Sequence, residues 1–428
     1  MKRILLASRL PALALAGGYL AAAAPAAGQA TAQAPGETGE QPAIKSTTTF
    51  LDVSAGVGYS SNPLLELQGR SSAFARLSLN AFHSWNSERG STSLSGYVED
   101  TSYLRGGYGS KDIFSLDART HQAVSERVQV SGDLSFSGDI AGQLENRFTT
   151  PVPVTPPPPE TTPPIATTPE IFNFSGRQYR LSGQVGASIA TGVRSNVTLS
   201  ASATHGFFTG QNKLADYTTY LGSFGYNHQL TEFTWIGADV SVQRQDFRGG
   251  NYANIVNPTA TLRTQLGQNI NASGSVGLLA IYDYRDGVSE HSYSPSFTAS
   301  ICRSGEKSQF CLNASRDATV PIGFGVGQGV QGASINTNLG LNYTRPIGRG
   351  GSIRATLTAT RDSTVDRLQT GKFTSTYLTG LVGYDRKVGH RLFAGVQAGV
   401  RRLYETGPDP STDFNGSVYL RYRLGDLL

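Results

Sequence analysis

The chain is poor both in charge and in hydrophobic residues. Only 16% of its 428 residues are charged and 38% are hydrophobic, whereas an average soluble domain has about 25% and about 45–50%. Beyond the first 30 residues, no stretch approaches the roughly 20 consecutive apolar residues that a membrane-spanning helix needs. These shortages exclude a helical membrane protein.

The motifs of common enzyme classes are missing as well. There is no GxSxG, no HExxH and no phosphate-binding glycine loop followed by lysine. Asp409 and Asp413 share a late loop and could bind a cation, but two acids in a loop with Ser and Pro are more often a solvated turn. We therefore predict that the chain is not an enzyme and has no resident cofactor and no metal site.

Small polar residues are abundant instead. The chain has 50 Gly, 44 Ser and 40 Thr, which together make up just under a third of it. It also has 19 Tyr and 19 Phe, too many for a disordered chain that buries no apolar surface. This composition favours a large β-protein whose strands face lipid on one side and water on the other.

The N-terminus has the pattern of a secretory signal. Lys2, Arg3 and Arg9 precede an apolar stretch, and small residues follow at Ala26 and Ala30. We predict a signal peptide at residues 1–26. Without these three cations the net charge falls from +5 to about +2. The basic balance thus belongs mostly to the leader, and we predict no nucleic-acid partner.

The chain has two cysteines, Cys302 and Cys311. An exported protein meets an oxidising compartment, so a local disulfide across a hairpin is the interpretation we favour. Two thiols alone would make a weak metal site.

From residue 47 onward, apolar and polar residues alternate. Leu51, Val53, Ala55, Val57 and Tyr59 alternate with polar or small residues, and so does the last such segment near the C-terminus. Strict period two over nine or more residues is typical of a strand with one apolar face. Segments of this kind begin near residues 50, 73, 91, 113, 128, 178, 197, 217, 233, 254, 269, 293, 309, 334, 352, 373, 391 and 413.

The connections between these segments alternate in length. Short turns such as 86–90, 191–195 and 346–350 alternate with longer loops at 60–72, 100–112, 138–177, 316–333 and 402–412. Alternating short and long connections are typical of outer-membrane barrels, with tight periplasmic turns and longer outer loops. We therefore predict an all-β fold: a transmembrane antiparallel up-and-down β-barrel of about 18 strands at residues 47–428, preceded by a periplasmic linker at 27–46. Its location would be the outer membrane of a Gram-negative bacterium, with outer-membrane lipid as its surroundings.

Aromatic residues near the strand ends fit the interfacial girdles of such barrels. The candidates are Tyr59, Trp85, Tyr97, Phe136, Tyr226, Tyr282, Tyr343, Tyr384 and Tyr422.

The loop at 138–177 contains nine of the 20 prolines. Such a segment prefers an extended polyproline conformation and does not pair as a strand. It is either an exposed flap or a flap that folds over the barrel mouth and gates it.

Arginines recur on the polar face of the alternation. A charged side chain facing lipid at mid-depth would cost roughly 2–4 kcal/mol, so these arginines are expected to line the lumen: Arg119, Arg180, Arg263, Arg354, Arg401, Arg421 and Arg423. The acids on the same face are Asp52, Glu99, Asp117, Asp133 and Asp239. The arginines would either select anionic or uronic-acid-bearing solutes or form an internal network with the acids that stiffens the wall. Three inward aromatics could stack on sugar rings: Tyr97, Trp235 and Tyr419.

The segment "DVSAGVGYSSNPLL" (Asp52 to Leu65) resembles the opening of a porin-type family of proteobacterial outer-membrane β-barrels, whose first strand ends in a Gly-Tyr followed by a Ser-Asn pair. Here these are Gly58, Tyr59, Ser61 and Asn62. Members of the family are often associated with exopolysaccharide biosynthesis and export. One departure concerns the C-terminus, where barrels usually end in an aromatic residue that the outer-membrane assembly machinery reads. This chain has Tyr422 and then ends in Gly-Asp-Leu-Leu.

Three functions remain open. The resemblance implies a channel or accessory component for export of an exopolysaccharide, which the arginines suggest is acidic, supplied by periplasmic export components. The alternatives are a general or solute-selective porin, and a non-conducting structural or assembly barrel plugged by its own loops.

Overall fold

The structure is a computed structural model, and it contains only strands, turns and loops among the residues that it describes. These are residues 46–425, except 66–67, 106–107, 109, 140–175, 211–215, 248, 286, 306, 320–333, 349, 365–373 and 406–408. The predicted signal peptide and all but the last residue of the predicted linker lie outside the described residues, and so does nearly all of the predicted proline-rich loop. No helix in the described part of the chain is long and apolar enough to span a membrane.

Eighteen strands make up the fold. The first nine are β1 (Ser46–Ser60), β2 (Ser72–Ser87), β3 (Gly90–Tyr103), β4 (Ser110–Ala123), β5 (Val128–Asp139), β6 (Gly176–Ala190), β7 (Ser195–Gly210), β8 (Tyr217–Thr231) and β9 (Thr234–Phe247). The second nine are β10 (Tyr252–Leu266), β11 (Ile270–Arg285), β12 (Val288–Gly305), β13 (Ser308–Thr319), β14 (Ser334–Ile347), β15 (Gly351–Thr364), β16 (Thr374–Lys387), β17 (Leu392–Glu405) and β18 (Ser411–Gly425).

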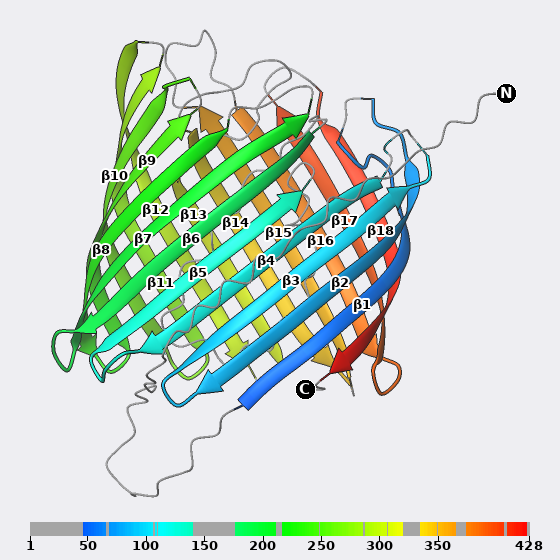
Figure 1. Cartoon of the computed structure of the whole chain (residues 1–428), viewed down its shortest axis with the longest axis horizontal. Coiled ribbons are helices and arrows are strands. Elements are labelled where there is room, and N and C mark those ends of the chain that lie inside the picture. Colours follow the sequence, from blue (N-terminus) through cyan, green and yellow to red (C-terminus); the bar gives the residue numbers. More distant parts are fainter. Residues whose placement is uncertain are drawn as a thin grey trace, which may run out of the picture.

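The strands form one closed antiparallel ring. Each strand pairs with the next along the chain, and β1 closes the ring by pairing with both β2 and β18. The strands run obliquely around the barrel, as Figure 1 shows. Closure leaves no sheet edge between the first and the last strand, so the backbone groups there are hydrogen-bonded within the wall. The predicted barrel of about 18 strands is confirmed.

The strand starts agree with the alternation pattern to within five residues, the largest difference being β12, which starts at Val288 rather than near residue 293. The long connections lie at the opposite end from the beginning of β1 and the end of β18, and we call this the outer end. Two connections at the outer end are shorter than the alternation predicts. Residues 248–251 join β9 to β10, and Asp286 and Gly287 join β11 to β12. Gly287 has a φ of +86°, a conformation that favours glycine in a tight turn.

Apolar side chains cover the outside of the ring. On β1, Val57 is 59% exposed, and on β11 Val276 is 66% exposed, while Asp52 on the inward face of β1 is 3% exposed. A ring of exposed Leu, Val and aromatic side chains would be unfavourable in water, but lipid covers it in a bilayer. A closed antiparallel barrel with an apolar outside and a polar inside is an outer-membrane barrel, and we place the chain in the outer membrane.

Aromatic side chains gather near the ends of this apolar band. At the outer end, Phe114 lies 5.3 Å from Phe136 and Tyr179 lies 4.9 Å from Phe207, both measured between ring centroids on neighbouring strands. At the opposite end of the barrel, which has the short turns and which we call the turn end, Trp85 is 45% exposed. One girdle prediction is wrong. The phenol of Tyr97 donates a hydrogen bond to the inward-facing Glu99, so Tyr97 faces the lumen rather than lipid.

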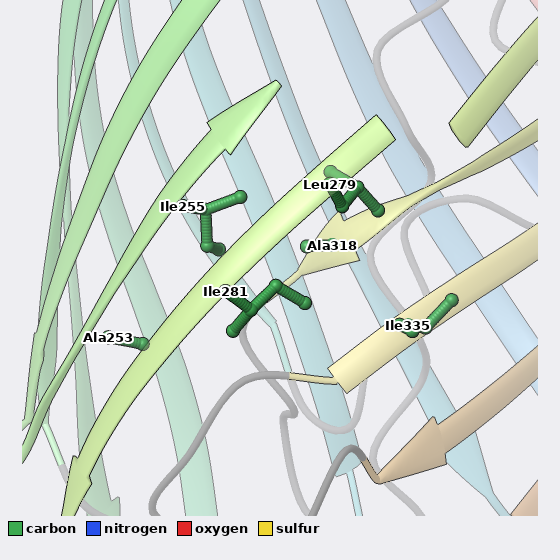
Figure 2. Close-up of a cluster of buried hydrophobic side chains, with 6 residues drawn as sticks. All are labelled: Ala253, Ile255, Leu279, Ile281, Ala318 and Ile335. Carbon is green, nitrogen blue, oxygen red and sulfur yellow. The ribbon is translucent and has the colours of Figure 1, made fainter. Parts of the chain in front are cut away.

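A small apolar core lies at the outer end of β10 to β14 (Figure 2). It consists of Ala253, Ile255, Leu279, Ile281, Ala318 and Ile335. Here β12 pairs with β13 only between Phe297 and Gly305. Arg316 bridges the two strands beyond this point, donating from Nε to the Pro295 carbonyl (3.2 Å) and from Nη2 to Ser294 Oγ (3.2 Å).

Candidate functional site: the inner wall of the barrel

The strand register places all seven predicted arginines on the inward face. Directly opposed residues on neighbouring strands share a face, and Asp52 lies opposite Arg423, Arg119 opposite Asp133, and Arg401 opposite Asp413. The remaining members of the set share this face through the same pairing pattern: Arg180, Arg263, Arg354 and Arg421. The structure does not bring the seven together, because they are distributed around the ring.

Two arginines on β18 belong to a buried ion layer. This layer crosses the closing seam, which is the junction between β1 and β18. Arg423 donates from Nε and Nη2 to the two carboxylate oxygens of Asp52 on β1, both at 2.7 Å. Arg421 donates from Nη2 to Asp385 on β16 at 3.0 Å, and its Nη1 lies 3.8 Å from Asp52. Both arginine side chains are at most 10% exposed. This geometry satisfies their charge within the wall.

Aromatic rings cover the same arginines. The guanidinium carbon of Arg423 lies 4.3 Å from the ring centroid of Phe50, and that of Arg421 lies 4.5 Å from that of Phe393. Phe50 in turn stacks on Phe82, with centroids 5.2 Å apart. Cation–π contact adds to ion pairing when the cation is shielded from water. The layer therefore holds β17, β18, β1 and β2 together.

Tyr419 extends this layer. It lies opposite Gly395 on β17, where a Cβ atom would come within 2.2 Å of the tyrosine ring. Because Gly395 has no side chain, the ring lies over the strand and its hydroxyl donates to Asp385 at 3.2 Å. Tyr419 thus acts as a wall contact of Asp385.

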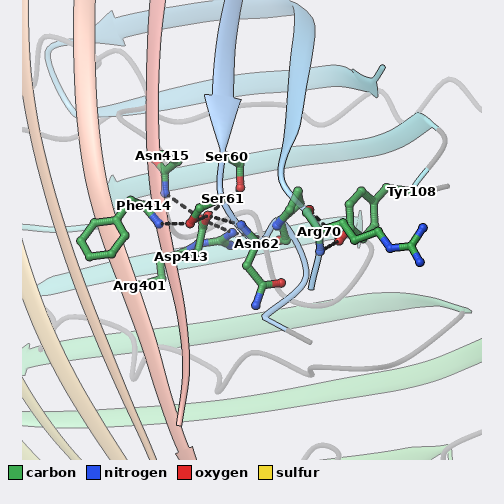
Figure 3. A network of polar contacts seen from close by, with 10 residues as sticks. Ser60, Ser61, Asn62, Arg70, Tyr108, Arg401, Asp413, Phe414 and Asn415 are labelled. Atoms are coloured by element: carbon green, nitrogen blue, oxygen red, sulfur yellow. Dashed lines mark hydrogen bonds and ion pairs between the residues drawn. The ribbon is translucent and has the colours of Figure 1, made fainter. Parts of the chain in front are cut away.

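A second buried network closes the outer end of the seam, shown in Figure 3. Asp413 is fully buried and accepts hydrogen bonds from Ser60 Oγ (2.7 Å), the backbone N–H of Asn62 (2.9 Å) and Arg401 Nη2 (2.8 Å). Arg401 also donates from Nη2 to the carbonyl of Pro63 at 2.8 Å. We call Arg401, Asp413 and the segment Ser60–Pro63 the mouth clamp.

The mouth clamp fixes the start of the first outer loop, residues 61–71, against the inward face of β17 and β18. Later in the same loop, the backbone N–H of Arg70 donates to the Tyr108 hydroxyl at 2.7 Å, and that hydroxyl donates to the Arg70 carbonyl at 2.8 Å. Leu65, with a φ of +53°, is 1% exposed. The described parts of this loop are therefore held at its start by β17 and β18 and at its end by Tyr108 of the connection between β3 and β4.

The clamp decides between the two interpretations of Asp413. Its carboxylate accepts hydrogen bonds from protein donors. Asp413 is therefore neither part of a solvated turn nor a cation ligand. Asp409 is exposed. Among the described residues, no group of three or more His, Cys, Asp or Glu side chains could hold a metal ion.

Arg76 on β2 is an inward charge that the sequence reading missed. Its Nε lies 3.2 Å from Oε1 of Glu99, which is 2% exposed and also accepts from Thr101 Oγ1 at 2.8 Å. The alternation on β2 carries the signal, because Phe74, Arg76 and Ser78 occupy every second position.

Four of the seven arginines are not enclosed in this way. Arg119 lies 3.5 Å from Asp133, but the two side chains are 65% and 46% exposed, and such pairs contribute little to stability. Arg180, Arg263 and Arg354 are half-buried and lie on β6, β10 and β15. All four lie on the inward face and are at least partly exposed.

The wall from β7 to β14 is lined mainly by hydroxyl and amide side chains. Ser300 Oγ donates to Asn313 Oδ1 at 2.7 Å, and Ser275 and Thr298 are joined by a hydroxyl–hydroxyl hydrogen bond of 2.7 Å. The predicted inward aromatic Trp235 lies on this wall, opposite Arg263.

The two cysteines also lie on this wall. Cys302 on β12 is directly opposite Cys311 on β13, and their sulfurs are joined in a disulfide. The described residues contain no free cysteine. The disulfide joins β12 to β13 close to the hairpin that connects these two strands at the turn end.

No protein-family model matches this chain, and no curated protein is similar to it. Among solved structures, OccK2 (OpdF) of Pseudomonas aeruginosa is 11% identical with a TM-score of 0.45, covering 89% of this chain and 98% of that chain. OccAB3 of Acinetobacter baumannii is 8% identical with a TM-score of 0.42, covering 89% and 99%. The FrpB iron transporter of Neisseria meningitidis is 8% identical with a TM-score of 0.43, covering 88% and 81%. These similarities are too distant to indicate a substrate for this chain.

Proposed function

We propose that this barrel is an outer-membrane diffusion channel for small polar solutes, with a preference for anions. Barrels of 16–18 strands are wide enough for an aqueous passage. From β7 to β14 the inner wall supplies hydroxyl and amide groups, which suit hydrated solutes rather than apolar ones.

The observation that carries the anion preference is that the inward face holds partly exposed arginines in addition to those of the buried ion layer. Arg401 and Arg423 are ion-paired with the buried carboxylates of Asp413 and Asp52, and Arg421 is ion-paired with Asp385, which is 13% exposed. Arg180, Arg263 and Arg354 are only half-buried on the inward face. A planar guanidinium in such a position offers paired donors to a passing carboxylate or phosphate. We assign selectivity to these three arginines and wall stiffening to the other set.

The experiment is ion selectivity in a planar bilayer. The purified barrel should conduct, and a KCl gradient should give a reversal potential of the sign that means Cl⁻ passes more readily than K⁺. The double variant Arg263→Ser/Arg354→Ser should move the reversal potential toward zero. Arg386→Ser on the lipid-facing side of β16 is the matched control and should leave it unchanged. A barrel that never conducts would contradict the channel and favour a non-conducting structural or assembly barrel.

Ionic strength sharpens the same test. The Debye length falls from about 10 Å at 0.1 M salt to about 3 Å at 1 M. If half-buried arginines set the preference, it should shrink as the KCl concentration rises. A preference that does not depend on salt would point to pore width instead of charge.

Export of an exopolysaccharide is the second candidate, and one observation favours it. The wall around β12 to β14 presents adjacent amide and hydroxyl side chains, including Ser300, Asn313, Asn338 and Asn342, that can hydrogen-bond to sugar hydroxyls. Periplasmic export components would then be partners, and the outer-membrane assembly machinery would be a partner under either function. Deleting the gene and measuring secreted polysaccharide separates the two. Unchanged secretion would leave the diffusion channel as the function.

A further inference from the structure

The outward face of β15 to β17 changes from apolar to basic at its outer end. Along β15 the outward positions end with Leu357 and Ala359, and the next outward residue is Arg361. Along β17 the outward residue Val400 is followed at the next outward position by Arg402. Leu357 is 56% exposed on the lipid-facing surface. The two arginines therefore stand directly at the outer edge of the apolar band.

The register brings these arginines into one patch. Arg361 lies opposite Thr337 on β14 and Thr376 on β16, and Thr376 lies opposite Tyr404 on β17. The guanidinium carbon of Arg402 lies 4.7 Å from the ring centroid of Tyr404. With strands about 4.8 Å apart, the two arginine backbones are separated by only about 12 Å. We call Arg361, Thr376, Arg402 and Tyr404 the outer basic patch.

The surroundings of the patch differ from those of the buried lumen arginines. Both Arg361 and Arg402 are exposed, and within the described part of the chain neither has a carboxylate at ion-pair distance. A cation at the edge of the hydrocarbon is tolerated only near the headgroup level, where an anion can reach it. Guanidinium groups fit phosphate in a bidentate geometry, and the hydroxyl of Thr376 suits sugar.

We infer that the outer basic patch binds a phosphorylated glycolipid of the outer leaflet. The arginines would hold its phosphate, Thr376 would lie beside its sugar, and its acyl chains would lie along the apolar band below. The inference rests on the lipid-facing surface and is independent of whether the lumen conducts.

The chain offers a matched control at the opposite end of the barrel. Arg345 on β14 and Arg386 on β16 are also exposed and outward-facing, but they lie at the turn end, against the inner leaflet. The double variants Arg361→Ala/Arg402→Ala and Arg345→Ala/Arg386→Ala remove the same charge from the same face. Heat-modifiable migration on a gel would verify that each variant is a closed barrel.

The experiment is binding of lipid A to the purified full chain in detergent, followed by native mass spectrometry. Lipid A should bind the unchanged chain, and its apparent Kd should rise roughly tenfold in Arg361→Ala/Arg402→Ala, as expected for losing a charge-assisted contact. The turn-end variant should bind as the unchanged chain does. Lipid A without its phosphates should bind as weakly to the unchanged chain as lipid A binds to the outer variant.

Three results would overturn the inference. These are no binding of lipid A to the unchanged chain, an equal loss in both double variants, or displacement of lipid A by an equal concentration of phosphatidylglycerol. The last result would mean that any anionic lipid satisfies the patch.

Discussion

Two parts of the inner wall are built in different ways. Around the closing seam, from β15 through β18 to β3, buried carboxylates and arginines pair across strands. From β7 to β14, neighbouring strands are joined by neutral hydroxyl and amide pairs. We call these the charged wall and the hydroxyl wall.

The difference follows from how each register is fixed. In the hydroxyl wall every strand follows its neighbour through a connection in the chain, and the turn and the inside–outside alternation hold the register. At the seam, β1 and β18 are joined by no turn, and Asp52 and Arg423 are 371 positions apart. A slip by one residue there would turn Arg421 and Arg423 toward lipid. Charged pairs therefore occupy the junction that local sequence cannot specify.

The largest expected effect comes from breaking the ion layer of the charged wall. Asp52→Ala leaves Arg421 and Arg423 buried without their shared carboxylate, and removing one partner of a buried pair costs about 3–5 kcal/mol. The urea concentration at the midpoint of unfolding should fall sharply. Unfolding is monitored by the heat-modifiable migration of the barrel on a gel. Ser275→Ala on the hydroxyl wall is the control. Equal midpoints for the two variants would show that the charged wall has no special part in closure.

The mouth clamp should give the next largest effect. Asp413→Asn removes the charge that Arg401 and the Ser60–Asn62 segment share, for a loss of about 1–3 kcal/mol. It should also release the first outer loop, which limited proteolysis between residues 61 and 71 would detect. Asp409→Asn, at an exposed position, is the comparison. Protease resistance equal to that of the unchanged chain would mean that Tyr108 alone holds the loop.

Removing the disulfide tests how much a covalent crosslink stabilises the hydroxyl wall. Replacing Cys302 and Cys311 by Ser opens a loop of about ten residues, for which the chain-entropy model gives about 2–3 kcal/mol as an upper value. Because the β12–β13 hairpin already holds these residues together, the measured loss should be smaller. Unfolding of the unchanged chain with and without dithiothreitol checks this. A loss of stability as large as that of Asp52→Ala would mean that the hydroxyl wall depends on its crosslink as much as the charged wall depends on its ion layer.

The smallest effect is expected from one hydroxyl pair. Ser300→Ala removes the hydrogen bond to Asn313, and a neutral hydrogen bond contributes about 0.5–1.5 kcal/mol. Because the wall borders water, Asn313 can be rehydrated, and the loss should lie at the lower end. A midpoint shift matching that of Asp413→Asn would show that the hydroxyl pairs are cooperative.

The alternation of apolar and polar residues was enough to predict the barrel and its strand phase. Period two depends only on which face meets lipid, so it placed Arg119 and Arg423 inward without any knowledge of their partners. Tyr97 shows where residue type misleads, because a tyrosine near a strand end suits a girdle equally well until its phase is considered.

The partners themselves could not be predicted. Ser60, Ser61 and Asn62 stand in the segment that resembles a porin-type opening, but their acceptor, Asp413, is about 350 positions away. Register between strands that are not consecutive leaves no local trace in one sequence. The division of the arginines into buried and half-buried sets depends on that register, so it emerged only from the structure.

The contacts at the seam also make closure of the barrel depend on the presence of its last strand. Asp52 and the Ser60–Pro63 segment lie near the beginning of the barrel, and their partners Asp413, Arg421 and Arg423 lie on its last strand. During assembly these contacts can form only after β18 has arrived. A chain that ends before β18 would have an Asp52 carboxylate without its arginines, a first outer loop without its contacts to Asp413, and an unpaired edge on β1. All three would lie at the seam. Truncated products would thus be distinguishable from finished barrels before they are sealed into the membrane.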